Sequence, residues 1–269
     1  MNTKKGRVFA TSDWHGCINV ANKVFEWLKP EDHLYFLGDA IDRGPAGIEI
    51  FNKLYDMPNV TMICGNHEQM FKECYTQYLY WRKFPDTKQY PLLYNWFIRN
   101  GGYATALELD SLTDEEVKEL AYKINTLQCG THYNNINNQI IYMEHAGFTP
   151  TLTPYRTHDA LWDRSHFSDE WSKENIYNDI YIVHGHTPVQ SMKYDSGYNG
   201  QPPFTIEEFK AKKDWENGGL GKEPTIIRYC SGHKFNIDMC TAYSNTIALL
   251  DLDTFAEIYF KGDITNESN

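Results

Sequence analysis

Residues 33–45 read H-L-Y-F-L-G-D-A-I-D-R-G-P, a short apolar run followed by two carboxylates three positions apart and an arginine. The run has the length and content of a buried strand, and the glycines and proline after it indicate a turn. A single acid after a strand is a common turn former, so Asp39 alone would mean little. The stretch becomes informative if metal-binding side chains also follow other strands, because a site is assembled in space.

Four further apolar runs also end at a polar cluster. They are R-V-F-A-T-S-D (7–13), V-T-M-I-C-G-N-H-E (60–68), Q-I-I-Y-M-E-H (139–145) and D-I-Y-I-V-H-G-H (179–186). Helical patterns separate the first three strands along the chain; one ends at Pro30 and the other before Pro58. This alternation of strand and helix predicts an α/β fold that begins with parallel strands.

The rest of the chain predicts helices and then more strands, within a single domain spanning 1–269. Residues 69–128 have a mostly helical pattern that includes a capping box, T-D-E-E, at 113–116. Short strands are expected again after residue 224. The stretch 191–223 is rich in glycine and proline, and we interpret about 191–233 as a loop insertion.

Composition limits the partners and the compartment. The 269 residues are 41% hydrophobic and 23% charged, and this composition is typical of a globular protein. The formal net charge is -11. Such an acidic chain lacks the basic surface that nucleic acids and anionic membranes require, so neither is expected as a partner. No signal core or bilayer-length apolar stretch is visible, and we expect a cytoplasmic protein. The six cysteines have no paired spacing and are expected to be reduced thiols.

Metal-binding side chains follow all five predicted strands. The candidates are Asp13, His15, Asp39, Asn66, His67, His145, His184 and His186. Ligands of open α/β sheets bind beyond the carboxyl ends of the strands, so these side chains are expected to converge. Carboxylate, imidazole and amide donors without thiolate suit Mn, Fe or Zn, and there are enough for two ions. Two adjacent ions need a bridging group, for which Asp39 is the natural candidate, and such a pair activates water for in-line attack.

These motifs resemble those of the PPP-type metallophosphatases, the family of protein serine/threonine phosphatases that includes small bacterial and phage enzymes. The matching stretches are S-D-W-H-G (12–16), G-D-A-I-D-R-G (38–44), G-N-H-E (65–68), H-A-G (145–147), W-D-R (162–164) and H-G-H-T-P (184–188). They occur in the family's order over residues 7–190. The resemblance implies a calcineurin-like metallophosphoesterase fold, with two mixed β-sheets packed as a sandwich and flanked by helices.

Carried over position by position, the resemblance implies two divalent ions, with manganese expected and iron or zinc as alternatives. The residues assigned to one ion are Asp13, His15 and Asp39, and those assigned to the other are Asp39, Asn66, His145 and His186. His67 would protonate the leaving oxygen and be oriented by Asp42. Arg43 and Arg164 would bind the phosphoryl oxygens, since a guanidinium fork matches them.

The same resemblance leaves more than one function open. A protein phosphatase acting on phosphoserine and phosphothreonine is favoured, with a phosphoprotein or phosphopeptide as partner. The related symmetrical diadenosine tetraphosphatases often carry Gln, Ala and Asp at the positions of His15, Asp42 and Glu68, and this chain keeps all three residues. A dinucleoside tetraphosphate hydrolase, another small-phosphoester phosphatase and a catalytically silent binding module are the alternatives.

Two departures from the family's sequence and one choice between histidines complete the prediction. Ser12 stands where the family normally has glycine, and I-D-M-C-T-A-Y-S-N (237–245) replaces the I-D-T-G that small relatives typically carry. Only one histidine of the H-G-H pair is a ligand in the family. His184 is therefore expected to pack near the site and His186 to bind.

Overall fold

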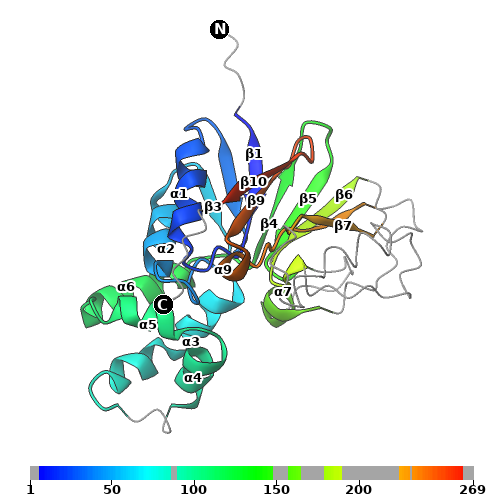
Figure 1. The fold of residues 1–269 in the computed structure, drawn as a ribbon. Helices are drawn as coiled ribbons and strands as arrows, with labels where there is room; N and C mark the ends of the chain where they lie inside the picture. The colour runs from blue at the N-terminus through cyan, green and yellow to red at the C-terminus, as the bar shows by residue number, and fades with distance from the viewer. Residues whose placement is uncertain are drawn as a thin grey trace.

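The chain forms two five-stranded β-sheets that pack against each other, with helices outside them (Figure 1). The computed structural model describes residues 6–85, 90–147, 157–164, 179–189, 224–230 and 232–262. Both sheets mix parallel and antiparallel strands, so the predicted α/β sandwich is confirmed. The expected insertion at about 191–233 lies for the most part outside the described residues.

The first sheet is built from both ends of the chain. The parallel strands β1 (Val8–Thr11), β2 (His33–Phe36) and β3 (Val60–Met62) are connected by the helices α1 (Ile18–Trp27) and α2 (Gly47–Asp56), as predicted. Two late antiparallel strands, β9 (Thr246–Asp251) and β10 (Glu257–Lys261), complete it. The strand order β10-β9-β1-β2-β3 places β1 at the centre.

The second sheet has the order β4-β5-β6-β8-β7. Its strands are β4 (Gly130–Asn134), β5 (Ile140–Glu144), β6 (Ile180–His184), β7 (Ile227–Tyr229) and β8 (Lys234–Asn236). The three central strands run parallel, and β4 and β7 pair antiparallel at the two edges. The sequence did not predict β4, which joins β5 through a polar turn where Asn138 has a φ of 60°.

Helices between β3 and β4 form what we call the helical lobe, which spans residues 66–125. It contains α3 (Asn66–Trp81), α4 (Pro91–Tyr94), a π-helical turn (Asn95–Arg99), α5 (Tyr103–Leu109) and α6 (Asp114–Asn125). The predicted capping box is present, since Thr113 Oγ1 accepts from the Glu116 backbone N–H and Glu116 accepts from the Thr113 N–H. Figure 1 shows the lobe below the sheets, with α1 and α2 beside the first sheet.

Two short helices complete the described secondary structure. These are α7 (Thr157–Trp162) and α9 (Thr241–Ser244). No helix in the described ranges is long and apolar enough to cross a membrane.

The first sheet buries apolar side chains on both faces. Phe9 of β1 and Leu249 of β9 belong to the core shared with the helices, whereas Ala10 and Leu250, one residue further on, belong to the core shared with the second sheet. This alternation follows from the two-residue period of a strand. Each fully buried Leu or Phe side chain contributes about 1.5–3 kcal/mol to folding. Packing on both faces fixes the carboxyl ends of the strands, where the candidate site lies.

Candidate active site

The five strand ends bring the predicted site residues together. The loop after β1 carries Asp13 and His15, the loop after β2 carries Asp39, and α3 begins with Asn66 and His67. From the second sheet, His145 follows β5 and His186 follows β6. All seven side chains are buried, although each is polar or ionisable. A group this polar is buried only when its members bond to one another or to a bound ion.

The loops that carry these residues have an unusual backbone. Six non-glycine residues of the site adopt positive φ angles: Asp13 (57°), His15 (42°), Asp39 (62°), Asp42 (71°), Arg43 (69°) and His186 (64°). Such left-handed conformations cost free energy and occur where the surrounding structure enforces them, often at functional sites. Here they lie in the loops that follow β1, β2 and β6 and carry the site residues.

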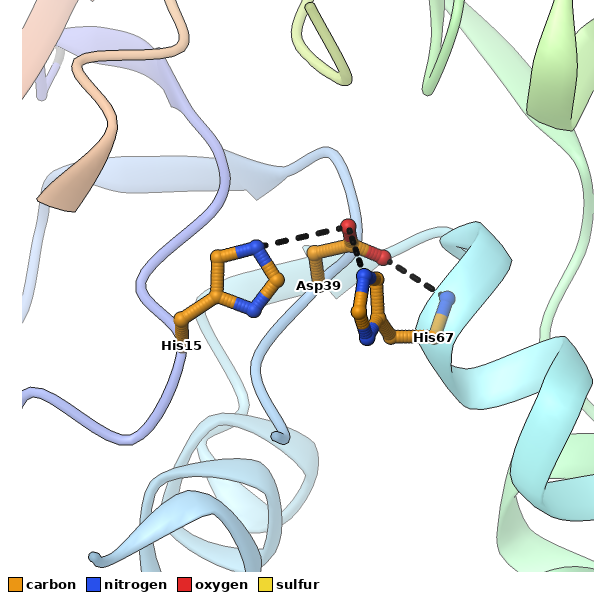
Figure 2. A group of neighbouring side chains, drawn as sticks. All are labelled: His15, Asp39 and His67. Atoms are coloured by element: carbon orange, nitrogen blue, oxygen red, sulfur yellow. Dashed lines mark hydrogen bonds and ion pairs between the residues drawn. The ribbon is translucent and has the colours of Figure 1, made fainter. Parts of the chain in front are cut away.

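Asp39 lies at the centre of the group. Its Oδ2 atom is 3.6 Å from His15 Nε2 and 3.8 Å from His67 Nε2, and it is 3.4 Å from His145 Nε2. Figure 2 shows the contacts with His15 and His67. Asp39 Oδ1 accepts a hydrogen bond of 3.0 Å from the His67 backbone N–H. One carboxylate oxygen therefore faces three imidazoles that come from both sheets and from α3.

The Glu68 carboxylate holds the turn that presents Asp39. Oε2 accepts from the backbone N–H groups of Asp39 (2.8 Å) and Gly65 (3.0 Å), and Oε1 accepts from those of Ala40 (2.8 Å) and Ile41 (3.3 Å). Glu68 is fully buried in the first turn of α3. It acts as a helix cap and as the support for the loop after β2.

Asn66 joins the two histidines of the second sheet. Its Oδ1 atom lies 2.7 Å from His145 Nε2 and 2.8 Å from His186 Nδ1. Asp13 Oδ2 accepts from the His186 backbone N–H at 3.1 Å. His145 is oriented from behind, because its Nδ1 lies 2.8 Å from the carbonyl oxygen of Leu37.

The donor set fits two divalent cations. Two groups of ligand atoms, His15–Asp39–His67 and Asp13–Asp39–His145, each lie within 4.8 Å of one another and share Asp39. Metal bonds of about 2.0–2.2 Å place neighbouring ligand atoms about 3 Å apart, which is near the separations observed around Asn66 Oδ1 and Asp39 Oδ2. The shared Asp39 lies where a bridging ligand is expected. Coordination by these residues stays a prediction, and proximity also allows His67 as a ligand.

The pKa shifts of the site residues show how the buried Asp39 charge is compensated. Burial raises the pKa of Asp39, but the charges of His145 and His67 outweigh burial and hold it well below the usual range. Burial likewise lowers the pKa of His145, yet Asp39 reverses this effect and raises it to about 10. A proton on His145 thus compensates the Asp39 charge in the metal-free protein. Burial, with the charges of His145 and Arg164, lowers the pKa of His186 to about 2, so this imidazole is neutral.

His67 and Asp42 form a buried pair beside this centre. His67 Nδ1 lies 2.7 Å from Asp42 Oδ2, and His67 Nε2 lies 3.1 Å from Arg43 Nη2. A guanidinium can only donate, so Nε2 accepts here and Nδ1 carries the proton donated to Asp42. This is the tautomer expected for a histidine oriented by Asp42.

The two arginines lie on different sides of the group. Arg43 Nη1 is 2.7 Å from His15 Nε2, so its guanidinium bridges His15 and His67. Arg164 is exposed, and its Nε donates to Thr187 Oγ1 at 3.0 Å. Its charge acts on His186, which places it beside the part of the site formed by the second sheet.

The two histidines of the H-G-H motif have different neighbours. His184 points away from the site, with Nε2 2.6 Å from the Tyr229 hydroxyl. His186 Nδ1 faces Asn66 Oδ1, and its Nε2 is buried without a hydrogen-bond partner within the described residues. Gly185 has no room for a side chain, because a Cβ there would lie 2.0 Å from Asp13 Oδ2.

The stretch 237–245, which differs in sequence from small relatives, contains a left-handed backbone position at Cys240. Cys240 stands where small relatives have the glycine of I-D-T-G, and its φ of 56° is in the left-handed region that glycine favours. Its backbone N–H is held by Asp238 Oδ1 at 2.7 Å.

Sequence reasoning missed three residues that contact or surround the group. Trp96 and Thr105 of the helical lobe bond to the Asp42 carboxylate. Asp238 is buried nearby, and burial together with the charge of Asp13 raises its pKa well above the usual range. The only local signal was the glycine pair 101–102 beside Trp96, which indicates a close backbone approach.

Comparison with known proteins agrees with this geometry. The calcineurin-like phosphoesterase family matches residues 6–234, which is most of the chain. A search of curated proteins gives no match. Among solved structures, a protein described as a presumed diadenosine tetraphosphatase superposes with a TM-score of 0.55 at 12% identity, covering 98% of this chain and 97% of that chain. A metallophosphoesterase from Sphaerobacter thermophilus gives a TM-score of 0.52 at 15% identity, covering 95% and 87%.

These findings define the class of the protein. The fold and the buried cluster of carboxylates and imidazoles at the strand ends are those of a metal-dependent phosphoester hydrolase. The chain belongs to the calcineurin-like phosphoesterase family, whose members typically bind two divalent metal ions. The structural likenesses, at 12% and 15% identity, speak for the fold alone.

Proposed function

We propose that the protein is a metal-dependent phosphomonoester hydrolase, and that its substrates are phosphoserine and phosphothreonine in proteins or peptides. The observation that carries the proposal is the buried His67–Asp42 pair, 2.7 Å apart, beside the Asp39 centre. A histidine held in this way is suited to donate a proton to a leaving group.

The need for such a proton depends on the leaving group. Serine and threonine leave as strongly basic alkoxides, and their departure is slow unless the oxygen is protonated. Symmetrical hydrolysis of a dinucleoside tetraphosphate releases a nucleoside diphosphate as the leaving group, which is a stable anion and gains little from an acid. An oriented His67 therefore favours phosphomonoesters of alcohols over dinucleoside tetraphosphates.

The side chains divide the remaining tasks. When bound, the two cations, for which manganese is our first choice, supply Lewis-acid activation of water and of the phosphoryl group. Asp39, His145 and the other assigned ligands would hold them. Arg43 and Arg164 would bind the phosphoryl oxygens, which supplies positive charge in a chain whose net charge is -11. Phosphate binding would also draw Arg43 from His67 Nε2, which must take up a proton to act as the acid.

The substrate class is tested by phosphate release from the manganese-loaded protein. A set of phosphoserine and phosphothreonine peptides, with phosphotyrosine peptides beside them, is compared with diadenosine tetraphosphate at matched concentration. We expect clear preference for the phosphoserine and phosphothreonine peptides. Preference for the dinucleotide would replace the proposal by a dinucleoside tetraphosphatase, and no release from any substrate would favour a silent binding module.

The role of His67 is tested separately by His67→Asn. The variant should lose turnover of the peptides while its manganese content, measured by atomic emission, stays equal to that of the wild type. Loss of manganese together with turnover would show that His67 is a ligand, as its distance to Asp39 permits.

A further inference from the structure

The Asp42 carboxylate has hydrogen-bond partners in addition to His67. It is completely buried and accepts three hydrogen bonds from side chains. His67 Nδ1 (2.7 Å) and Trp96 Nε1 (2.8 Å) share Oδ2, and Thr105 Oγ1 donates to Oδ1 at 2.6 Å. All three donors belong to the helical lobe: His67 lies in the first turn of α3, and Trp96 and Thr105 lie further along the lobe, away from the other site residues in sequence.

Thr105 fixes the backbone of Asp42 as well as its side chain. The Asp42 N–H donates to Thr105 Oγ1 at 2.9 Å while the same hydroxyl donates to the carboxylate. One threonine hydroxyl can make both bonds, because it is a donor and an acceptor. The Arg43 N–H donates to the carbonyl oxygen of Gly101 at 3.0 Å. Asp42 and Arg43, with φ angles of 71° and 69°, are thus held in strained conformations by residues of the lobe.

The indole of Trp96 has little freedom to move. It is buried and packs on Phe71 and Phe97, with ring centroids 5.5 Å and 5.7 Å away. A Cβ on Gly102 would lie 2.4 Å from the indole ring, so only glycine allows this packing. Trp96 itself lies in a π-helical turn, a distortion that often marks functional positions. Its N–H is therefore presented to Asp42 at a fixed place.

We propose that Trp96 and Thr105 are positioning residues for the acid step, acting on His67 through Asp42. This inference rests on the proposed function, in which His67 is the acid. A buried carboxylate that loses one donor turns to recover a partner, and His67 Nδ1 then loses its fixed acceptor. The lobe thereby sets the direction of the proton on His67 without contacting the substrate.

The affected step is the departure of the leaving group. A water oxygen forms the new P–O bond, and the ester P–O bond breaks with its electron pair passing to the leaving oxygen. The proton on His67 Nε2 neutralises that oxygen. One proton of the water stays on the phosphate, and the other returns to His67 through the solvent. Imprecise placement of His67 therefore slows the hydrolysis of esters with basic leaving groups. It has little effect on the hydrolysis of esters whose leaving group is already a stable anion.

The experiment compares phenyl phosphate, a poor leaving-group ester, with 2,4-dinitrophenyl phosphate, a good one, on the manganese-loaded enzyme. Trp96→Phe removes the N–H and keeps an aromatic ring, and Thr105→Val removes the hydroxyl in a side chain of equal shape. We expect kcat on phenyl phosphate to fall about 10- to 100-fold, as part of the 10²–10⁴ that acid catalysis contributes, and kcat on the dinitrophenyl ester to stay within about threefold. Thr105→Ser should restore the wild-type ratio.

Trp81→Phe is the matched control. Trp81 also lies in the lobe and packs on Phe97, with centroids 5.2 Å apart, so its variant tests general loosening of the lobe. It should leave both esters unchanged. Equal losses on both esters in Trp96→Phe and Thr105→Val would overturn the inference and indicate a structural role only. If Trp96→Phe does not fold, the Thr105→Val and Thr105→Ser pair decides alone.

The failure of the proposed function looks different. A wild-type enzyme that hydrolyses neither ester would contradict the proposed phosphomonoester hydrolase, and a His67→Asn variant that loses both esters equally would remove His67 as the acid. The inference about Trp96 and Thr105 would then fall with it. A leaving-group effect in His67→Asn that is absent from both lobe variants would refute the inference alone.

Discussion

Glu68→Gln should destabilise the protein strongly, although it replaces one side chain by another of almost equal shape. The Glu68 carboxylate accepts four backbone hydrogen bonds, two on each oxygen. A glutamine keeps one oxygen and presents an NH₂ group to the other two N–H donors. Two hydrogen bonds to a charged acceptor are therefore lost in a buried place, and each contributes about 1.5–3 kcal/mol.

The expected loss in the free energy of unfolding is about 3–6 kcal/mol. With a urea slope of about 3 kcal/mol per molar for a chain of this size, the unfolding midpoint should fall by about 1–2 M. Manganese affinity should fall as well, because the Asp39 backbone N–H is one of the groups released. Urea unfolding followed by circular dichroism and titration calorimetry with manganese measure the two effects.

Glu116→Gln is the matched control for this prediction. Glu116 occupies the same position in the first turn of α6 as Glu68 does in α3, and also accepts from the residue that caps its helix. Glu116 is exposed, so water can replace its bonds and the midpoint should barely move. If Glu68→Gln shifts the midpoint no more than Glu116→Gln, the role we give to the buried carboxylate is wrong.

Three further predictions concern the site and its surroundings. Gly185→Ala places a Cβ 2.0 Å from Asp13 Oδ2 and should abolish high-affinity manganese binding in calorimetry; unchanged affinity would mean that this loop moves freely. Loading with manganese at pH 7.5 should release about one proton, since burial is outweighed by Asp39 and the pKa of His145 is raised to about 10. Calorimetry in buffers of different ionisation enthalpy measures this release, and its absence would contradict a protonated His145. Burial raises the pKa of Glu108 from its ordinary 4.5 to about 7, so its contribution to stability is complete below about pH 4.5 and is lost as the pH rises to 7. The stability of the wild type relative to Glu108→Gln should therefore fall between pH 5 and pH 8 in urea unfolding, and a rise would contradict the raised pKa.

The strands that carry the site were predictable because each is an apolar run that ends abruptly in polar residues. This pattern locates β1, β2, β3, β5 and β6 and the side chains that follow them. β4 was missed because G-T-H-Y-N has no apolar alternation, and it is a strand only because β5 offers hydrogen-bonding partners. The packing of one sheet on the other came from family resemblance and not from the pattern.

The candidate metal ligands could be predicted equally well, since they lie within motifs of a few residues. The residues that donate to Asp42 could not be predicted, because Trp96 and Thr105 lie 54 and 63 residues further along the chain. The pattern of an aromatic helical segment predicts that its tryptophan packs in the core. Nothing in the neighbouring sequence indicates what its N–H bonds to. Only the folded lobe reveals which of the aromatic residues has a polar task.

The strand order of the first sheet has a consequence for synthesis of the chain. β1 is made first, yet one of its two neighbours is β9, and Phe9 pairs with Asp251. While the ribosome adds the residues between them, β1 has an open edge and the apolar side chains of α1 lack their partners from β9 and β10. Such edges favour aggregation, and contacts so distant in sequence form slowly. Newly made chains therefore depend on β9 and β10 to complete the first sheet.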